Sequence, residues 1–124
     1  SARFFDHPFA DAARMREAGL ELCLGTDSLA SSPSLSLLDE ARALREADVE
    51  ITDSELLDMC TRSGAEALGF DNLGVLKPGG AADFCVVCPP RGTGGFNLGD
   101  VFDPGAFVVC TVTNGEVRYE APSG

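Results

Sequence analysis

The sequence is poor in basic side chains and contains a single histidine. Only 9 Lys and Arg residues stand against 20 Asp and Glu residues, so the formal net charge is −11. Nucleic acids are bound by Lys and Arg side chains that neutralise phosphates, and helices that lie on membranes usually carry a basic face. We therefore expect neither nucleic acid nor a membrane surface as a partner.

Long apolar runs are also lacking. No stretch approaches the roughly 20 residues that a membrane-spanning helix needs. The first residues, SARFFDHPF, hold no long apolar segment and no small-residue cleavage site, which argues against a signal peptide. The chain begins with Ser instead of Met, which suggests a processed, recombinant or partial chain.

The five cysteines, an odd number, lie among apolar neighbours. Cysteines in such positions are usually reduced and packed in a core, which suits a cytoplasmic protein. Cys85 and Cys88 form a C-x-x-C pair within a predicted strand, where positions three apart point to opposite faces. A zinc or redox role for this pair is therefore the weaker hypothesis, and buried packing is the expected one.

The first 70 residues alternate between helical and strand-like patterns. A helix is predicted over 9–19, followed by a short apolar strand over 20–24 of the kind found in buried parallel sheets. A second helix is predicted to begin with Ser32 as its cap and Pro33 in its first position. Thr52 to Glu55 is a capping box that predicts a third helix, and 63–69 predicts a short helix that ends at a glycine.

From about residue 70 the pattern changes to turns and strands. The segment 89–105 is rich in Gly and Pro and has no periodicity, which predicts a loop. Asn114-Gly115 between two β-prone runs is the strongest short signal for a hairpin. The predicted strands cover 82–88, 107–113 and 116–119.

Three stretches together resemble the C-terminal end of metal-dependent amidohydrolases, in the deaminase and chlorohydrolase-like branch. They are LELCLGTDSLASSPSLSLLDE at 20–40, CTRSGAEALGF at 60–70 and LGVLKPGGAADFCVV at 73–87, completed by VTNGEVRY at 112–119. The resemblance implies an α/β fold: the C-terminal fragment of a (β/α)8 TIM barrel, followed by part of a small β-sandwich. Residues 1–70 would supply the last barrel strand and helices, and 71–124 the C-terminal strands of the sandwich.

By the same resemblance, Asp27 matches the last metal-site residue of the family, just beyond the eighth barrel strand. It would be both a metal ligand and the catalytic group that takes a proton from a metal-activated water. Thr26 and Ser28 would orient its carboxylate. The plain alternative is an aspartate that begins a turn and hydrogen-bonds its own backbone.

The resemblance also places the segment around Phe5 and His7 near the mouth of the barrel, after its seventh strand. We therefore expect these two side chains to contact substrate. A histidine in a surface loop beside a proline is an equally supported alternative. His7 is not assigned to the metal.

The other metal ligands of the family are missing, because this chain has no His-x-His pair. Catalytic zinc normally takes three protein ligands and a water, so Asp27 alone cannot hold it. We expect a divalent metal, zinc or else iron, with most of its ligands outside this chain. The chain by itself is then inactive, and its partner is the remainder of a longer enzyme.

Two hypotheses for the function remain open. The first is part of a metal-dependent hydrolase that acts on non-peptide carbon–nitrogen bonds of a small molecule, such as a deaminase of an N-heterocycle. The second is a non-catalytic α/β interaction module whose apolar faces bind a partner protein. A homo-oligomer is compatible with both.

Overall fold

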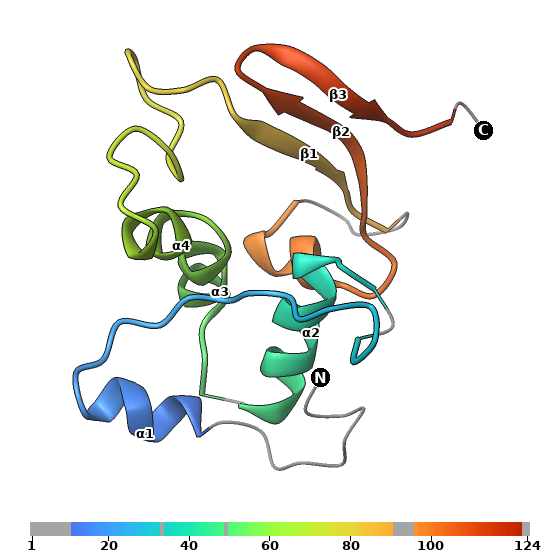
Figure 1. The fold of residues 1–124 in the computed structure, drawn as a ribbon. Helices are drawn as coiled ribbons and strands as arrows, with labels where there is room; N and C mark the ends of the chain where they lie inside the picture. The colour runs from blue at the N-terminus through green and yellow to red at the C-terminus, as the bar shows by residue number, and fades with distance from the viewer. Residues whose placement is uncertain (1–10, 33, 49, 91–95, 123–124) are drawn as a thin grey trace.

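The computed structural model describes residues 11–32, 34–48, 50–90 and 96–122 (Figure 1). In Figure 1 the helices of the first half lie together, and the strands of the second half form one sheet beside them. The elements in chain order are α1 (Ala12–Glu17), α2 (Leu37–Ala47), α3 (Asp53–Cys60), α4 (Arg62–Ala67), β1 (Phe84–Cys88), the 3-10 helix η1 (Leu98–Phe102), β2 (Phe107–Thr113) and β3 (Glu116–Glu120). None of the helices in these ranges is long and apolar enough to cross a membrane.

A small hydrophobic core lies where α2, α3 and η1 meet. Its buried members are Ala41, Ile51, Leu56, Met59 and Phe102. Leu22 and Leu24, which precede Asp27 in the chain, pack against this core from outside. Because Phe102 comes from the second half of the chain, the core ties the helices to the segment that leads into the sheet.

The start of α3 is the capping box that the sequence predicts. The Glu55 N–H donates to the Thr52 hydroxyl oxygen at 3.2 Å, and the Thr52 N–H donates to Glu55 Oε2 at 2.8 Å. The Thr52 hydroxyl also donates to the same carboxylate oxygen at 2.6 Å. These bonds from Thr52 lower the pKa of Glu55.

The predicted start of α2 is wrong. The helix begins at Leu37, and its cap is Ser36, whose hydroxyl oxygen accepts the N–H of Asp39. Ser32 is buried and hydrogen-bonds elsewhere, while Pro33 lies outside the described residues. Several serines in this stretch could cap a helix, and acidic residues in the first turn after Ser36 favour the later start.

The predicted strand over 20–24 is also wrong. The segment is extended, but no strand pairs with it among the residues that the structure describes. Its backbone hydrogen bonds to the helices run from the Leu20 N–H to the Met15 carbonyl and from the Leu24 N–H to the Met59 carbonyl, each at 3.1 Å. Leu20 is 57% exposed and Cys23 is exposed. A strand needs a neighbour for its ladder of hydrogen bonds, and an apolar pattern does not supply one.

The segment 89–105, expected to be a loop, contains η1. The Asn97 N–H donates to Asp100 Oδ2 at 2.8 Å at the start of this helix. Phe102, only 2% exposed, fixes its other end in the core. The loop prediction is wrong here because a five-residue 3-10 helix is too short to leave a periodic apolar pattern.

The sheet confirms the predicted strands and hairpin. Its order is β1-β2-β3, and both pairs are antiparallel. Thr113 pairs with Glu116 across a two-residue turn, in which Asn114 has φ 52° and Gly115 has φ 76°. Positive φ at both central residues is the type I′ turn that suits the twist of a hairpin.

The cysteines are free thiols, but their predicted burial holds only in part. Cys60, Cys88 and Cys110 are partly buried, whereas Cys23 and Cys85 are exposed. The expectation of core packing is wrong for the two exposed residues. Each lies in an extended segment, where alternate side chains point away from the neighbouring layer.

Candidate functional site

Asp27 stands at the end of the extended segment, where the chain turns toward α2. The Ser28 N–H donates to Asp27 Oδ1 at 2.8 Å, and the Ser31 hydroxyl donates to Asp27 Oδ2 at 2.6 Å. The Ser28 carbonyl closes the turn by accepting the N–H groups of Ser31 and Ser32, each at 3.0 Å. Asp27 therefore does begin a turn and bind its own backbone, as the plain alternative predicts.

The same contacts also favour the ionised form of the Asp27 carboxylate. The hydrogen bond from the Ser31 hydroxyl, and then the one from the Ser28 N–H, lower the pKa of Asp27. The side chain is therefore ionised at neutral pH. A carboxylate offers about four acceptor sites, and the two serines occupy one on each oxygen. Because Asp27 is exposed, its other sites can accept a cation or a proton.

The residues expected to orient Asp27 contribute unequally. Ser28 contacts the carboxylate through its backbone N–H, and its hydroxyl oxygen accepts the Ala30 N–H at 3.3 Å. Thr26 is exposed and makes no hydrogen bond to Asp27 within the described residues. Ser31, which the sequence pattern did not indicate, makes the shortest contact with the carboxylate. Its one signal in the sequence is its spacing, four residues after an aspartate in a serine-rich turn.

Phe5 and His7, expected to contact substrate, lie outside the described residues. Their position relative to Asp27 therefore stays a prediction.

Asp27 fits a metal site as one oxygen ligand. Its carboxylate is exposed and ionised and has unused lone pairs, which suits a divalent cation. Within the part of the chain that the structure describes, no three His, Cys, Asp or Glu side chains gather closely enough to hold a metal ion. A complete site would need ligands beyond these residues.

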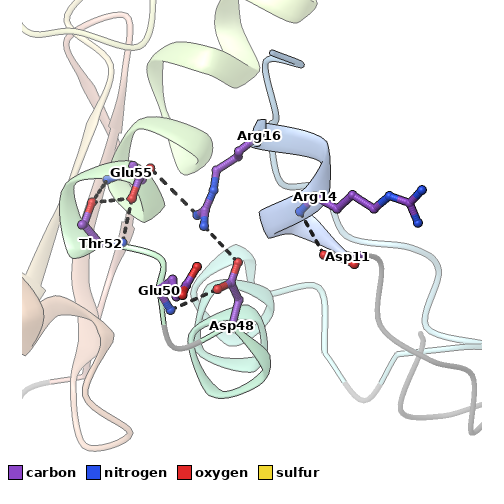
Figure 2. A network of polar contacts seen from close by, with 7 residues as sticks. All are labelled: Asp11, Arg14, Arg16, Asp48, Glu50, Thr52 and Glu55. Atoms are coloured by element: carbon purple, nitrogen blue, oxygen red, sulfur yellow. Dashed lines mark hydrogen bonds and ion pairs between the residues drawn. The ribbon is translucent and has the colours of Figure 1, made fainter. Parts of the chain in front are cut away.

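A network of ion pairs holds α1, the helix that leads into the Asp27 segment (Figure 2). Arg16 Nη2 lies 3.2 Å from Asp48 Oδ2 at the end of α2, and Arg16 Nη1 lies 3.9 Å from Glu55 Oε1 in α3. The side chain of Asp48 is only 11% exposed, so it depends on this cation. The extended segment thus begins at a helix fixed to α2 and α3, and Leu24 anchors its middle to Met59.

Comparison with known proteins gives a family match and several relatives. A model described as "Amidohydrolase family" matches residues 6–117. A protein of Shouchella clausii named 5-methylthioadenosine/S-adenosylhomocysteine deaminase is 40% identical over 90 residues, which cover 66% of this chain and 20% of that protein.

Two solved structures are similar in fold. Aminofutalosine deaminase of Helicobacter pylori is 31% identical with a TM-score of 0.70, over 88% of this chain and 28% of that one. A mutant of atrazine chlorohydrolase from Arthrobacter aurescens, complexed with zinc and atraton, is 30% identical with a TM-score of 0.70, over 90% of this chain and 28% of that one. The chain thus spans between a fifth and just over a quarter of the length of these relatives.

Proposed function

Since a model of the amidohydrolase family matches residues 6–117, this chain belongs to that family, and we propose that it is part of a hydrolase acting on carbon–nitrogen bonds of a small molecule. Its relatives lie in the deaminase and chlorohydrolase-like branch. A nitrogen heterocycle that carries an amino group is the substrate class that the names of the deaminase relatives suggest.

The observation that carries this proposal is the setting of Asp27. Its carboxylate is exposed and ionised, and each of its oxygens is oriented by one serine. Asp27 would be one ligand of a divalent metal, with zinc favoured by the zinc complex of a relative and iron as the alternative. Zinc bound there would supply Lewis-acid chemistry and lower the pKa of a water toward about 7. Asp27 would hold the proton of that water and pass it to the leaving nitrogen.

The remaining ligands would come from the rest of a longer protein. We infer that residues 1–70 form the last part of a barrel and that 71–124 add the sheet of a small β-sandwich. The extended segment before Asp27 supports the first inference, because Leu22 and Leu24 face the core while the segment has no partner strand among the described residues. The antiparallel sheet supports the second. Phe5 and His7 would contact the substrate.

An Asp27→Asn variant of the longer protein tests this function. The amide cannot act as a proton acceptor and is a weaker metal ligand, so we expect turnover to fall roughly 100-fold or more. The assay follows ammonia release from 5-methylthioadenosine and measures zinc per chain. Asp71→Asn is the matched control, because Asp71 is exposed and its side chain has no partner among the described residues. Full turnover and zinc content in Asp27→Asn would refute the proposal.

The second candidate is a non-catalytic module that binds a partner protein. Large exposed apolar side chains favour it, among them Leu68 at 75% and Leu76 at 66% exposure. The same side chains would be covered by the rest of a longer enzyme. A longer protein without turnover or bound zinc, in which these residues contact another chain, would support this candidate over the enzyme.

A further inference from the structure

The hydrogen bond between Ser31 and Asp27 joins a buried hydroxyl to an exposed carboxylate. Ser31 is only 5% exposed, whereas the carboxylate that it binds is exposed. Its Oγ lies 2.6 Å from Asp27 Oδ2, the length of a hydrogen bond strengthened by the negative charge of its acceptor. A donor shielded from water in this way has little competition from solvent for its proton.

The two bonds to Asp27 fix the direction of its carboxylate. Ser31 binds Oδ2, and the Ser28 N–H binds Oδ1 at 2.8 Å. Rotation of the carboxylate about its Cβ–Cγ bond would break both bonds. Without the Ser31 hydroxyl, only one oxygen would be held, and the carboxylate could turn.

The donor itself is held in place. The Ser31 N–H donates to the Ser28 carbonyl at 3.0 Å, and its Oγ lies 3.3 Å from the same oxygen. The hydroxyl of the next residue, Ser32, points to other groups, since it lies 2.7 Å from the Ser34 carbonyl and 3.3 Å from Glu40 Oε1. The Ser31 hydroxyl is therefore held by its own turn, without help from the Ser32 side chain.

We propose that Ser31 is a positioning residue for Asp27: its hydroxyl sets the orientation in which the carboxylate meets the metal and the reacting water. This inference rests on the proposed function of Asp27. The competing explanation is that Ser31 only stabilises the turn. Ser32 separates the two explanations, because it is equally buried, at 5% exposure, and belongs to the same turn but donates to other groups.

The test uses variants of the longer protein and two measurements. The first is the affinity of the metal-free protein for Zn²⁺, measured by competition with a chromophoric chelator. The second is kcat and KM for ammonia release from 5-methylthioadenosine. For Ser31→Ala we expect both Zn²⁺ affinity and kcat to fall roughly 10- to 100-fold, as for other groups that orient metal ligands. We expect KM to change less than about threefold, because substrate binding is not the target.

Control variants exclude a general loss of stability. Ser32→Ala should keep Zn²⁺ affinity and kcat even if thermal unfolding moves to a lower temperature. Ser31→Thr and Ser31→Val have the same shape and differ in the hydroxyl, so Thr should exceed Val in both quantities. If Ser31→Ala does not fold, the comparison of Ser31→Thr with Ser31→Val tests the role of the hydroxyl instead.

Four results would overturn the inference. They are wild-type behaviour of Ser31→Ala, equal losses in Ser31→Ala and Ser32→Ala, equal values for the Thr and Val variants, and full activity and Zn²⁺ affinity of Asp27→Asn. The first three leave the proposed function standing if Asp27→Asn is inactive. The fourth refutes the proposed function as well. Failure of the Ser31 inference alone is therefore distinguishable from failure of the proposed function.

Discussion

At the scale of single residues, burial and hydrogen bonding set the acidity of two side chains in opposite directions. Hydrogen bonds from Ser31 and Ser28 lower the pKa of Asp27. Burial at the end of α3, with a smaller contribution from nearby Cys85, raises the pKa of the Cys60 thiol to about 11. Asp27 is therefore ionised at neutral pH, while Cys60 is a poor nucleophile at that pH.

The Cys60 thiol should resist alkylation. A pKa of about 11 against an ordinary 9.0 implies an approximately 100-fold smaller thiolate fraction at pH 8. We expect iodoacetamide to modify the exposed thiols of Cys23 and Cys85 well before Cys60, as measured by peptide mass spectrometry. The rate at Cys60 should keep rising as the pH approaches 11. Equal rates for the three thiols at pH 8 would contradict this prediction.

Sequence patterns identified only part of the candidate site at this scale. Asp27 was identified by its resemblance to a family motif, which needs no three-dimensional information. The role of Ser31 depends on the turn that brings its hydroxyl back to Oδ2, and that turn is not visible in the sequence. Thr26 adjoins Asp27 in the chain but makes no hydrogen bond to it within the described residues.

At the scale of elements, sequence signals predicted helix starts and turns correctly where two residues favour the same local structure. Thr52 and Glu55 reciprocally define the start of α3, and Asn114-Gly115 defines the hairpin. Where several residues could begin the same helix, the sequence predicted the wrong start. The serines between Asp27 and α2 offer several caps, and the first turn after Ser36 decides between them.

Arg16 should hold α1 against the other helices. It is the residue of α1 that forms ion pairs with α2 and α3, and Asp48 is largely buried beneath it (Figure 2). We expect Arg16→Ala to lower the free energy of unfolding by about 1–3 kcal/mol, because a largely buried carboxylate loses its cation. Urea unfolding measures this change, and hydrogen exchange should become faster over residues 12–24.

Arg14 is the matched control for this prediction. It lies in the same helix and is exposed, and its guanidinium forms no ion pair among the described residues. Arg14→Ala should change the unfolding free energy by less than about 0.5 kcal/mol. Similar losses in both variants would show that α1 is sensitive to any change and that the ion pairs of Arg16 are not special.

At the scale of the whole molecule, much apolar surface is exposed. The outer strands of the sheet carry Phe84 at 40%, Val117 at 60% and Tyr119 at 48% exposure. Both edges of the three-stranded sheet lack a partner strand within the described residues. Exposed apolar area and open strand edges of this kind favour association with other protein.

The 124-residue chain on its own should therefore self-associate. We expect light scattering after size exclusion to give a mass above the 12.9 kDa of one chain, and a hydrophobic dye to bind more strongly than it does to the longer protein. A compact monomer with cooperative unfolding would contradict this expectation. That result would favour a self-standing module over a part of a larger fold.

The sequence alone determined which helices and strands have strong local signals, and through its resemblance to a family motif it pointed to Asp27 as the candidate site residue. These features depend on neighbours a few residues apart, so the local chain specifies them. Only the tertiary structure decided that 20–24 runs extended without a partner strand among the described residues, that η1 completes the core through Phe102 and that Ser31 reaches Asp27. Each of these depends on which groups meet through space, because backbone pairing, burial and side-chain hydrogen bonds all need a second segment in contact.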